Sequence, residues 1–80
     1  MSIDVSKLLS KDELGSLIGD RIKKIRVAKG ISQSELSRLC EKDRQHIELI
    51  ENNKISANIY TLYVISHALQ VDFSELFKFD

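Results

Sequence analysis

The stretch DRQHIELIENNK, residues 43–54, has two different faces when it is drawn as a helix. At about 100° per residue, Ile47 and Ile50 fall together and form an apolar edge that predicts packing against a core. The opposite face carries Leu49 among polar side chains: Arg44, Gln45, Glu48 and Asn52. An apolar side chain on a polar face indicates a contact outside the core, and the surrounding sequence suggests which contact this is.

Capping residues divide the rest of the chain into short helices. Ser10 followed by Glu13 is the pattern of a capping box, and the apolar stripe that starts there ends at Gly30, which favours a helix C-terminus. The other four helices are expected to begin at residues that favour the N-cap position: Ser32, Asp43, Asn58 and Asp72. The last of these N-caps is followed by Glu75 at the spacing of a second capping box, and Asn53 is expected to end the third helix.

The sequence predicts an all-α fold in one small domain. No alternation of apolar and polar residues is long enough for a strand, and proline is absent. Apolar residues mark the side of each helix that faces the core: Leu14, Ile18, Ile22 and Ile25 in the first, Leu36, Leu39 and Cys40 in the second, and Leu62, Ile65 and Leu69 in the fourth. The core should be thin, because a chain of this size buries only roughly 60% of the surface that it exposes when unfolded.

Composition argues against several classes of protein. The single cysteine, Cys40, cannot form an internal disulfide, and the chain has no C-x-x-C or H-x-x-x-H spacing, so neither a metal nor another cofactor is predicted. His46 and His67 lie on different predicted helices, with no Gly-rich loop or pair of carboxylates on a shared face, so no enzyme is predicted. Because the chain has no apolar membrane span and no secretory signal, we expect a cytoplasmic protein.

Charge is distributed unevenly although the net charge is zero. Residues 21–54 hold nine Lys/Arg against five Asp/Glu, a balance of +4, and the two ends of the chain together carry −4. A basic segment in a small helical domain favours contact with nucleic-acid phosphates, although an ordinary uneven surface would show the same balance. Charge alone leaves both interpretations open.

A short connection at residues 41–43 joins the second and third predicted helices, as in a helix-turn-helix. The segments IGDRIKKIRVAKGISQSELSRLCEKDRQHIELIENNK (residues 18–54) and LYVISHALQVDFSELF (residues 62–77) resemble the Cro and lambda-repressor-like helix-turn-helix family, of the XRE type. The resemblance implies a five-helix lambda-repressor-like DNA-binding domain. It also implies that the third helix, residues 43–52, enters the major groove of double-stranded DNA.

The resemblance assigns roles to individual side chains. Those expected to contact DNA are Gln33 at a phosphate, Arg44, Gln45 and Leu49 at bases, and His46, Asn52 and Lys54 at the DNA backbone. Their chemistry fits, because arginine can bind guanine, glutamine can bind adenine, and a leucine can contact the methyl group of thymine. A contact with thymine would thus explain why Leu49 lies outside the predicted core. Glu48 on the same face either accepts a hydrogen bond from a cytosine amino group or orients Arg44, and we favour the second role.

The resemblance also sets boundaries and exposes departures. It places the domain at residues 18–80, after an N-terminal extension and the start of helix one at residues 1–17. The family commonly has glycine where this chain has Glu41, and a left-handed glutamate costs about 1 kcal/mol or more, so we expect this turn to differ locally. Arg26 and Glu51 stand where the family often has an ion pair, which predicts a buried pair here.

The fourth predicted helix carries a second apolar side that needs cover: Tyr60, Tyr63, Val64 and His67. The cover is either a second copy of the chain, helped by Phe77 and Phe79, or the chain's own N-terminal segment with Val5, Leu8 and Leu9. We favour the second copy, because helix-turn-helix proteins gain specificity by binding two half-sites.

We therefore predict a sequence-specific DNA-binding transcriptional regulator, namely a homodimeric repressor. Two alternatives remain open. One is a DNA-binding antitoxin with a protein partner on the aromatic surface of helix four, and the other is a protein-interaction module that has kept the fold and lost DNA.

Overall fold

The computed structural model of the chain describes residues 4–79. Over this range the elements are η1 (Val5–Lys7), α1 (Lys11–Ala28), α2 (Gln33–Leu39), α3 (Arg44–Glu51), α4 (Ile59–Ala68) and η2 (Phe73–Phe77), where η denotes a 3-10 helix. The predicted all-α, lambda-repressor-like fold is confirmed, with the 3-10 helix η2 as the last of the five predicted helices and η1 as an additional turn before them. None of the helices within residues 4–79 combines the length and hydrophobicity that crossing a lipid bilayer requires.

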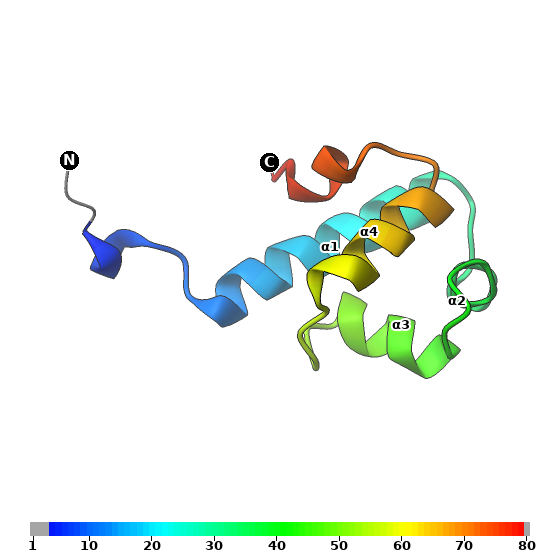
Figure 1. The fold of residues 1–80 in the computed structure, drawn as a ribbon, viewed down its shortest axis with the longest axis horizontal. Coiled ribbons are helices and arrows are strands. Elements are labelled where there is room, and N and C mark those ends of the chain that lie inside the picture. The colour runs from blue at the N-terminus through cyan, green and yellow to red at the C-terminus, as the bar shows by residue number, and fades with distance from the viewer. Residues whose placement is uncertain (1–3, 80) are drawn as a thin grey trace.

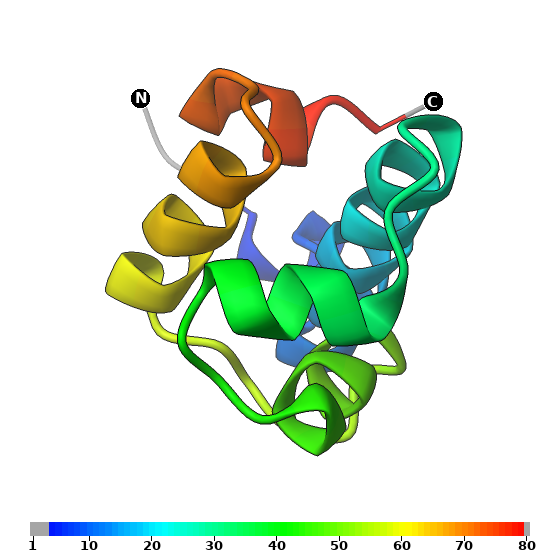
Figure 2. The same cartoon turned by 90° about the vertical axis from the view of Figure 1, so that its right-hand side faces the viewer.

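The elements surround a core that lies between α1 and α4. Figure 2 shows α1 and α4 on opposite sides of the domain, with α2 passing across them. In Figure 1, α3 lies along the lower edge of the molecule, and η2 lies along the upper edge. The N-terminal segment continues away from the body beyond the start of α1 (Figure 1). The arrangement leaves one long side of α3 uncovered.

Three of the predicted N-caps make their hydrogen bonds. The Ser10 hydroxyl accepts from the backbone N–H of Glu13 at 3.0 Å, and the Glu13 carboxylate accepts from the backbone N–H of Ser10 at 2.9 Å, so the capping box is complete. The hydrogen bond from the Ser10 backbone N–H is the main cause that holds the pKa of the Glu13 carboxyl below its usual value, and the Ser10 side chain adds to it. Ser32 and Asn58 accept from the backbone of the third residue beyond them, at 3.0 and 2.8 Å.

The two aspartates occupy N-cap positions without bonding through their side chains. Asp43 precedes α3 and Asp72 precedes η2, and neither makes a side-chain cap. The predicted second capping box is therefore wrong, because Glu75 is engaged elsewhere. Arg21 of α1 donates to the backbone carbonyl of Glu75 at 2.8 Å and to its carboxylate at 3.3 Å, and Lys78 also pairs with that carboxylate. The hydrogen bond from Lys78 is the main cause that lowers the pKa of Glu75.

Each α-helix is followed by one residue in the left-handed conformation. Gly30 has φ 70°, and the other three are not glycines: Glu41, Asn53 and Gln70, with φ of 56°, 54° and 59°. The expectation that the turn at Glu41 departs from the family geometry is wrong. The backbone N–H of Lys42 donates to the carbonyl of Ser37 at 2.9 Å, a bond that recurs at the other helix ends and offsets the cost of the left-handed residue.

The predicted core is confirmed apart from two leucines. The fully buried side chains are Ile22, Leu36, Ile47, Ile65, Leu69 and Leu76. Cys40 is buried with them, and this burial raises the pKa of its thiol. Leu14 is 42% exposed because it lies near the start of α1, and Leu39 is 51% exposed because Leu36 and Cys40 occupy the inner side of the short helix α2.

Candidate nucleic-acid interface

Helix α3 has the two faces that its sequence predicts. Ile47 and Ile50 are buried in the core. The opposite side, which we call the outer face of α3, consists of Arg44, Gln45, Glu48, Leu49 and Asn52, which are exposed or half-buried. Asp43 and Asn52 occupy the N-cap and C-cap positions of the helix, so the predicted span of 43–52 is confirmed. In Figure 1, no other helix lies below α3.

A buried ion pair anchors the C-terminal end of α3 to α1. The Arg26 guanidinium donates to the Glu51 carboxylate through Nε at 2.6 Å and through Nη2 at 3.0 Å. Glu51 is only 2% exposed and Arg26 is 8% exposed. Arg26 also donates to the backbone carbonyl of Ile31 at 2.8 Å, so its charge is well satisfied. The predicted buried pair is confirmed.

Gln33 joins this pair and connects α2 to it. Its side-chain amide donates to Oε1 of Glu51 at 3.1 Å, so one carboxylate touches α1, α2 and α3. Gln33 is half-buried as the first residue of α2. Its amide keeps one hydrogen and its carbonyl oxygen for other partners, so a phosphate contact remains compatible with this geometry.

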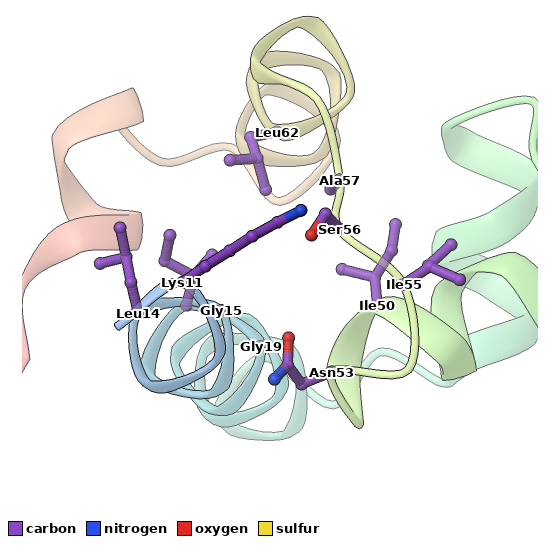
Figure 3. Close-up of a pocket in the computed structure, with 11 residues that line it drawn as sticks. Lys11, Leu14, Gly15, Gly19, Ile50, Asn53, Ile55, Ser56, Ala57 and Leu62 are labelled. Atoms are coloured by element: carbon purple, nitrogen blue, oxygen red, sulfur yellow. The ribbon is translucent and has the colours of Figure 1, made fainter. Parts of the chain in front are cut away.

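Asn53 forms a second anchor, which its sequence did not predict. Its left-handed backbone turns the side chain toward α1, where the amide donates to the carbonyl of Asp12 at 3.0 Å and to the hydroxyl of Ser16 at 3.2 Å. Figure 3 shows Asn53 pointing at α1. The approach is close, because a Cβ added at Gly15 would lie 2.3 Å from the side-chain oxygen of Asn53. The only sequence signal was the asparagine at the helix end.

A groove of about 240 Å³ lies behind this anchor, between α1, the segment 53–57 and the start of α4 (Figure 3). Its walls are mostly apolar and include Ile18, Ile50 and Leu62. Gly19 also lines it, at a point where an added Cβ would meet the backbone carbonyl of Ile50 at 2.7 Å. None of the outer-face residues of α3 lines the groove, so it is separate from the candidate interface.

Glu48 and Asn52 form a pair on the outer face of α3. The side-chain amide of Asn52 donates to the backbone carbonyl of Glu48 at 3.0 Å and to its carboxylate Oε1 at 3.1 Å. Within the described residues the partner of the Glu48 carboxylate is thus Asn52, which differs from the expected role of orienting Arg44. Both amide hydrogens of Asn52 are used in these bonds, so contact with the DNA backbone would have to break one of them.

The remaining candidate residues differ in how firmly they are held. Arg44 and Gln45 are exposed in the first turn of α3, and their side chains make no hydrogen bond or ion pair with residues 4–79. Lys54 is exposed just beyond Asn53, and His46 is half-buried. Arg44 and Gln45 are therefore free to bind a ligand that approaches the outer face.

A second surface lies on α4 and η2, and we call it the aromatic surface. It consists of Tyr60, Tyr63, His67, Phe73 and Phe77, whose neighbouring rings have centroids 5.1 to 6.4 Å apart. Val64 and Phe73 are both half-buried and pack against the core, but only Phe73 belongs to this surface, because its ring also contacts those of Tyr63 and Phe77. Phe79 is half-buried beside α1.

The chain's own N-terminal segment leaves its leucines uncovered. Leu8 is 58% exposed and Leu9 is 53% exposed, while the side chain of Val5 lies outside what the structure describes. Tyr60 remains 71% exposed and Tyr63 remains 50% exposed. The N-terminal segment therefore does not cover this side of α4, and of the two alternatives only a partner molecule remains.

The fold and the outer face of α3 define a helix-turn-helix protein. Residues 22–76 match the sequence model of HTH_3, described as Helix-turn-helix, and the chain therefore belongs to this XRE-type family of DNA-binding proteins. The protein is a DNA-binding transcriptional regulator and not an enzyme. A comparison with curated proteins gave no match.

Solved structures of restriction-modification controller proteins and of a transcriptional regulator share the fold. The restriction-modification controller protein C.Esp1396I is 36% identical, with a TM-score of 0.76 over 80% of this chain and 83% of that chain. The controller protein C.AhdI from Aeromonas hydrophila is 28% identical, with a TM-score of 0.74 over 76% and 92% of the two chains. An HTH_3 family transcriptional regulator from Vibrio cholerae is 26% identical, with a TM-score of 0.81 over 85% of this chain and 38% of that one.

Proposed function

We propose that the protein is a homodimeric repressor that recognises a specific DNA sequence through the outer face of α3. The observation that carries this proposal is the contrast between the two ends of α3. Its C-terminal end is fixed to α1 by Glu51 and Asn53, whereas Arg44 and Gln45 project freely from its first turn. A fixed helix with free polar side chains is suited to the major groove, where each base pair presents a distinct pattern of hydrogen-bonding groups.

The side chains divide into two roles in this proposal. Arg44 binds guanine, Gln45 binds adenine, and Leu49 contacts the methyl group of thymine, so these three specify the sequence. The residues that hold the DNA backbone are Gln33, His46 and Lys54. Contacts to phosphate fix the position of the protein without selecting bases.

A second copy of the chain covers the aromatic surface in the proposed dimer. Exposed tyrosines on one face are typical of a site of association. Because α3 and η2 lie along opposite edges of the molecule in Figure 1, a partner on η2 would leave the outer face of α3 open. A twofold dimer would place two recognition helices about 34 Å apart, which requires an operator of twofold symmetry.

Repression is the simplest outcome of such binding, because occupying an operator excludes other proteins from it. The similarity to restriction-modification controller proteins makes the genes of a restriction-modification system the first targets to test. A reporter gene under a candidate operator should fall in expression when the protein is present. A rise would show an activator instead.

Selection of bound sequences from random double-stranded DNA tests the proposal directly. We expect an inverted repeat, with the two half-sites about one helical turn apart. Enrichment of a single unrepeated site would contradict the dimer, and no enrichment would contradict sequence-specific binding. Copurification of a different protein on the aromatic surface would favour the antitoxin alternative.

A further inference from the structure

The pair formed by Glu48 and Asn52 sits in the middle of the outer face, where the proposed function places base edges. Chemistry fixes the orientation of the Asn52 amide, because both of its neighbours are oxygen acceptors: the carbonyl and the carboxylate Oε1 of Glu48. The amide must therefore present its NH₂ group to them. The other carboxylate oxygen, Oε2 of Glu48, accepts no hydrogen bond from residues 4–79, so it is available to another partner.

A carboxylate on a DNA-binding surface has few favourable partners. It repels phosphates, so it cannot serve as a backbone contact. In the major groove, cytosine presents an amino donor, and adenine presents an amino donor beside the acceptor N7. A negative charge beside N7 is unfavourable, so the carboxylate favours cytosine over adenine.

We propose that Glu48 selects cytosine at one position of each half-site, and that Asn52 is a positioning residue that holds the carboxylate for this contact. The inference rests on the proposed function and deepens it. Glu48 also disfavours binding to other sequences, because its charge lowers affinity for DNA wherever no cytosine satisfies it. The residue thus lowers affinity and raises specificity together.

The test compares selections from random DNA by the wild type and by Glu48→Gln, Glu48→Ala and Asn52→Ala. The wild type should prefer cytosine at one position of each half-site by about tenfold, the size of a good base contact. Glu48→Gln should change this preference to adenine, because a glutamine amide can bind adenine N6 and N7 together. Glu48→Ala should abolish the preference at that position and leave the others unchanged.

Asn52→Ala should weaken the cytosine preference several-fold at the same position, while the melting temperature stays close to that of the wild type. A purely structural role would lower stability and leave the base preference unchanged. Both Glu48 variants should also bind DNA without an operator several-fold more tightly. Glu41→Gln is the matched control, because it removes an exposed charge from the turn before α3 and should leave every base preference unchanged.

The outcomes separate the inference from the function on which it rests. If the wild type selects an operator and Glu48→Ala selects the same one, the role of Glu48 is refuted and the proposed function stands. If Asn52→Ala keeps the full cytosine preference, the positioning role of Asn52 is refuted. If the wild type selects no sequence, both the inference and the proposed function fail.

Discussion

Replacing Glu51 by alanine should remove the main polar support of the domain. The change leaves the Arg26 guanidinium buried, with the carbonyl of Ile31 as the partner that the structure still gives it. It also removes the acceptor of the Gln33 amide. Losing one partner of a buried pair costs about 3–5 kcal/mol, because the other charge stays out of water without compensation.

The size of this loss is large for a small domain. At about 0.05–0.15 kcal/mol per residue, 80 residues have a total unfolding free energy of about 4–12 kcal/mol. A loss of about 3–5 kcal/mol should lower the melting temperature by about 12–40 °C, since each kcal/mol corresponds to about 4–8 °C in a domain of this size. Glu51→Ala should be marginally folded or unfolded at 37 °C.

Urea unfolding followed by circular dichroism measures the change, and Glu48→Ala is the matched control on the same helix. Glu48 is half-buried and bonded to Asn52 within one helix, a pair worth about 0.2–0.5 kcal/mol. If both variants lose less than about 1 kcal/mol, the pair behaves as an exposed one in solution, and the reasoning from its burial is refuted.

Four further predictions concern binding, assembly and pH. Arg44→Ala should relax base preference at one position per half-site by about 1–3 kcal/mol. Lys54→Ala should instead weaken binding to all sequences alike and lower the slope of log affinity against log salt concentration by about one. Titration of single-base operator variants at several salt concentrations separates the two effects. Tyr63→Glu should halve the mass measured by sedimentation, and Tyr63→Phe should keep the dimer. The lowered pKa of Glu75 stabilises the fold above the ordinary value of 4.5, and this stability should be lost as pH falls through the folded pKa; an NMR titration of the carboxyl group would refute this if its pKa were not below 4.5. Asn53→Gly keeps the left-handed turn but removes both bonds to α1, so it should lower specific binding more than nonspecific binding, as competition with random DNA would show.

Local signals were the predictable part of the fold. Ser10, Ser32 and Asn58 bond to backbone groups three residues away, so their sequence neighbourhood is enough to place three helix starts. The left-handed turn at Glu41 was missed for a related reason. The predicted cost was that of the left-handed backbone of Glu41 alone. The hydrogen bond from the Lys42 backbone N–H to the Ser37 carbonyl, which closes the turn, was not included.

Contacts between distant segments were only partly predictable. The pair of Arg26 and Glu51 was expected from the family resemblance. The bond of Asn53 to Asp12 spans 41 residues, and no local pattern indicates which helix an asparagine at a helix end will face. The pairing of Glu75 with Arg21 spans 54 residues and replaced the capping box that spacing alone predicted.

The two anchors of α3 divide the helix into a part that fixes position and a part that recognises sequence. A base contact requires its side chain to lie within about 0.5 Å of the productive geometry, so the helix that carries it cannot tilt freely. Glu51 supplies this constraint from the core and Asn53 from the side of the helix end that faces α1, and neither would touch DNA in the proposed complex. Phosphate contacts through flexible side chains tolerate such a tilt far better. Loss of an anchor should therefore lower the ratio of specific to nonspecific affinity before it lowers affinity as a whole, which makes that ratio the most direct measure of how α3 is held.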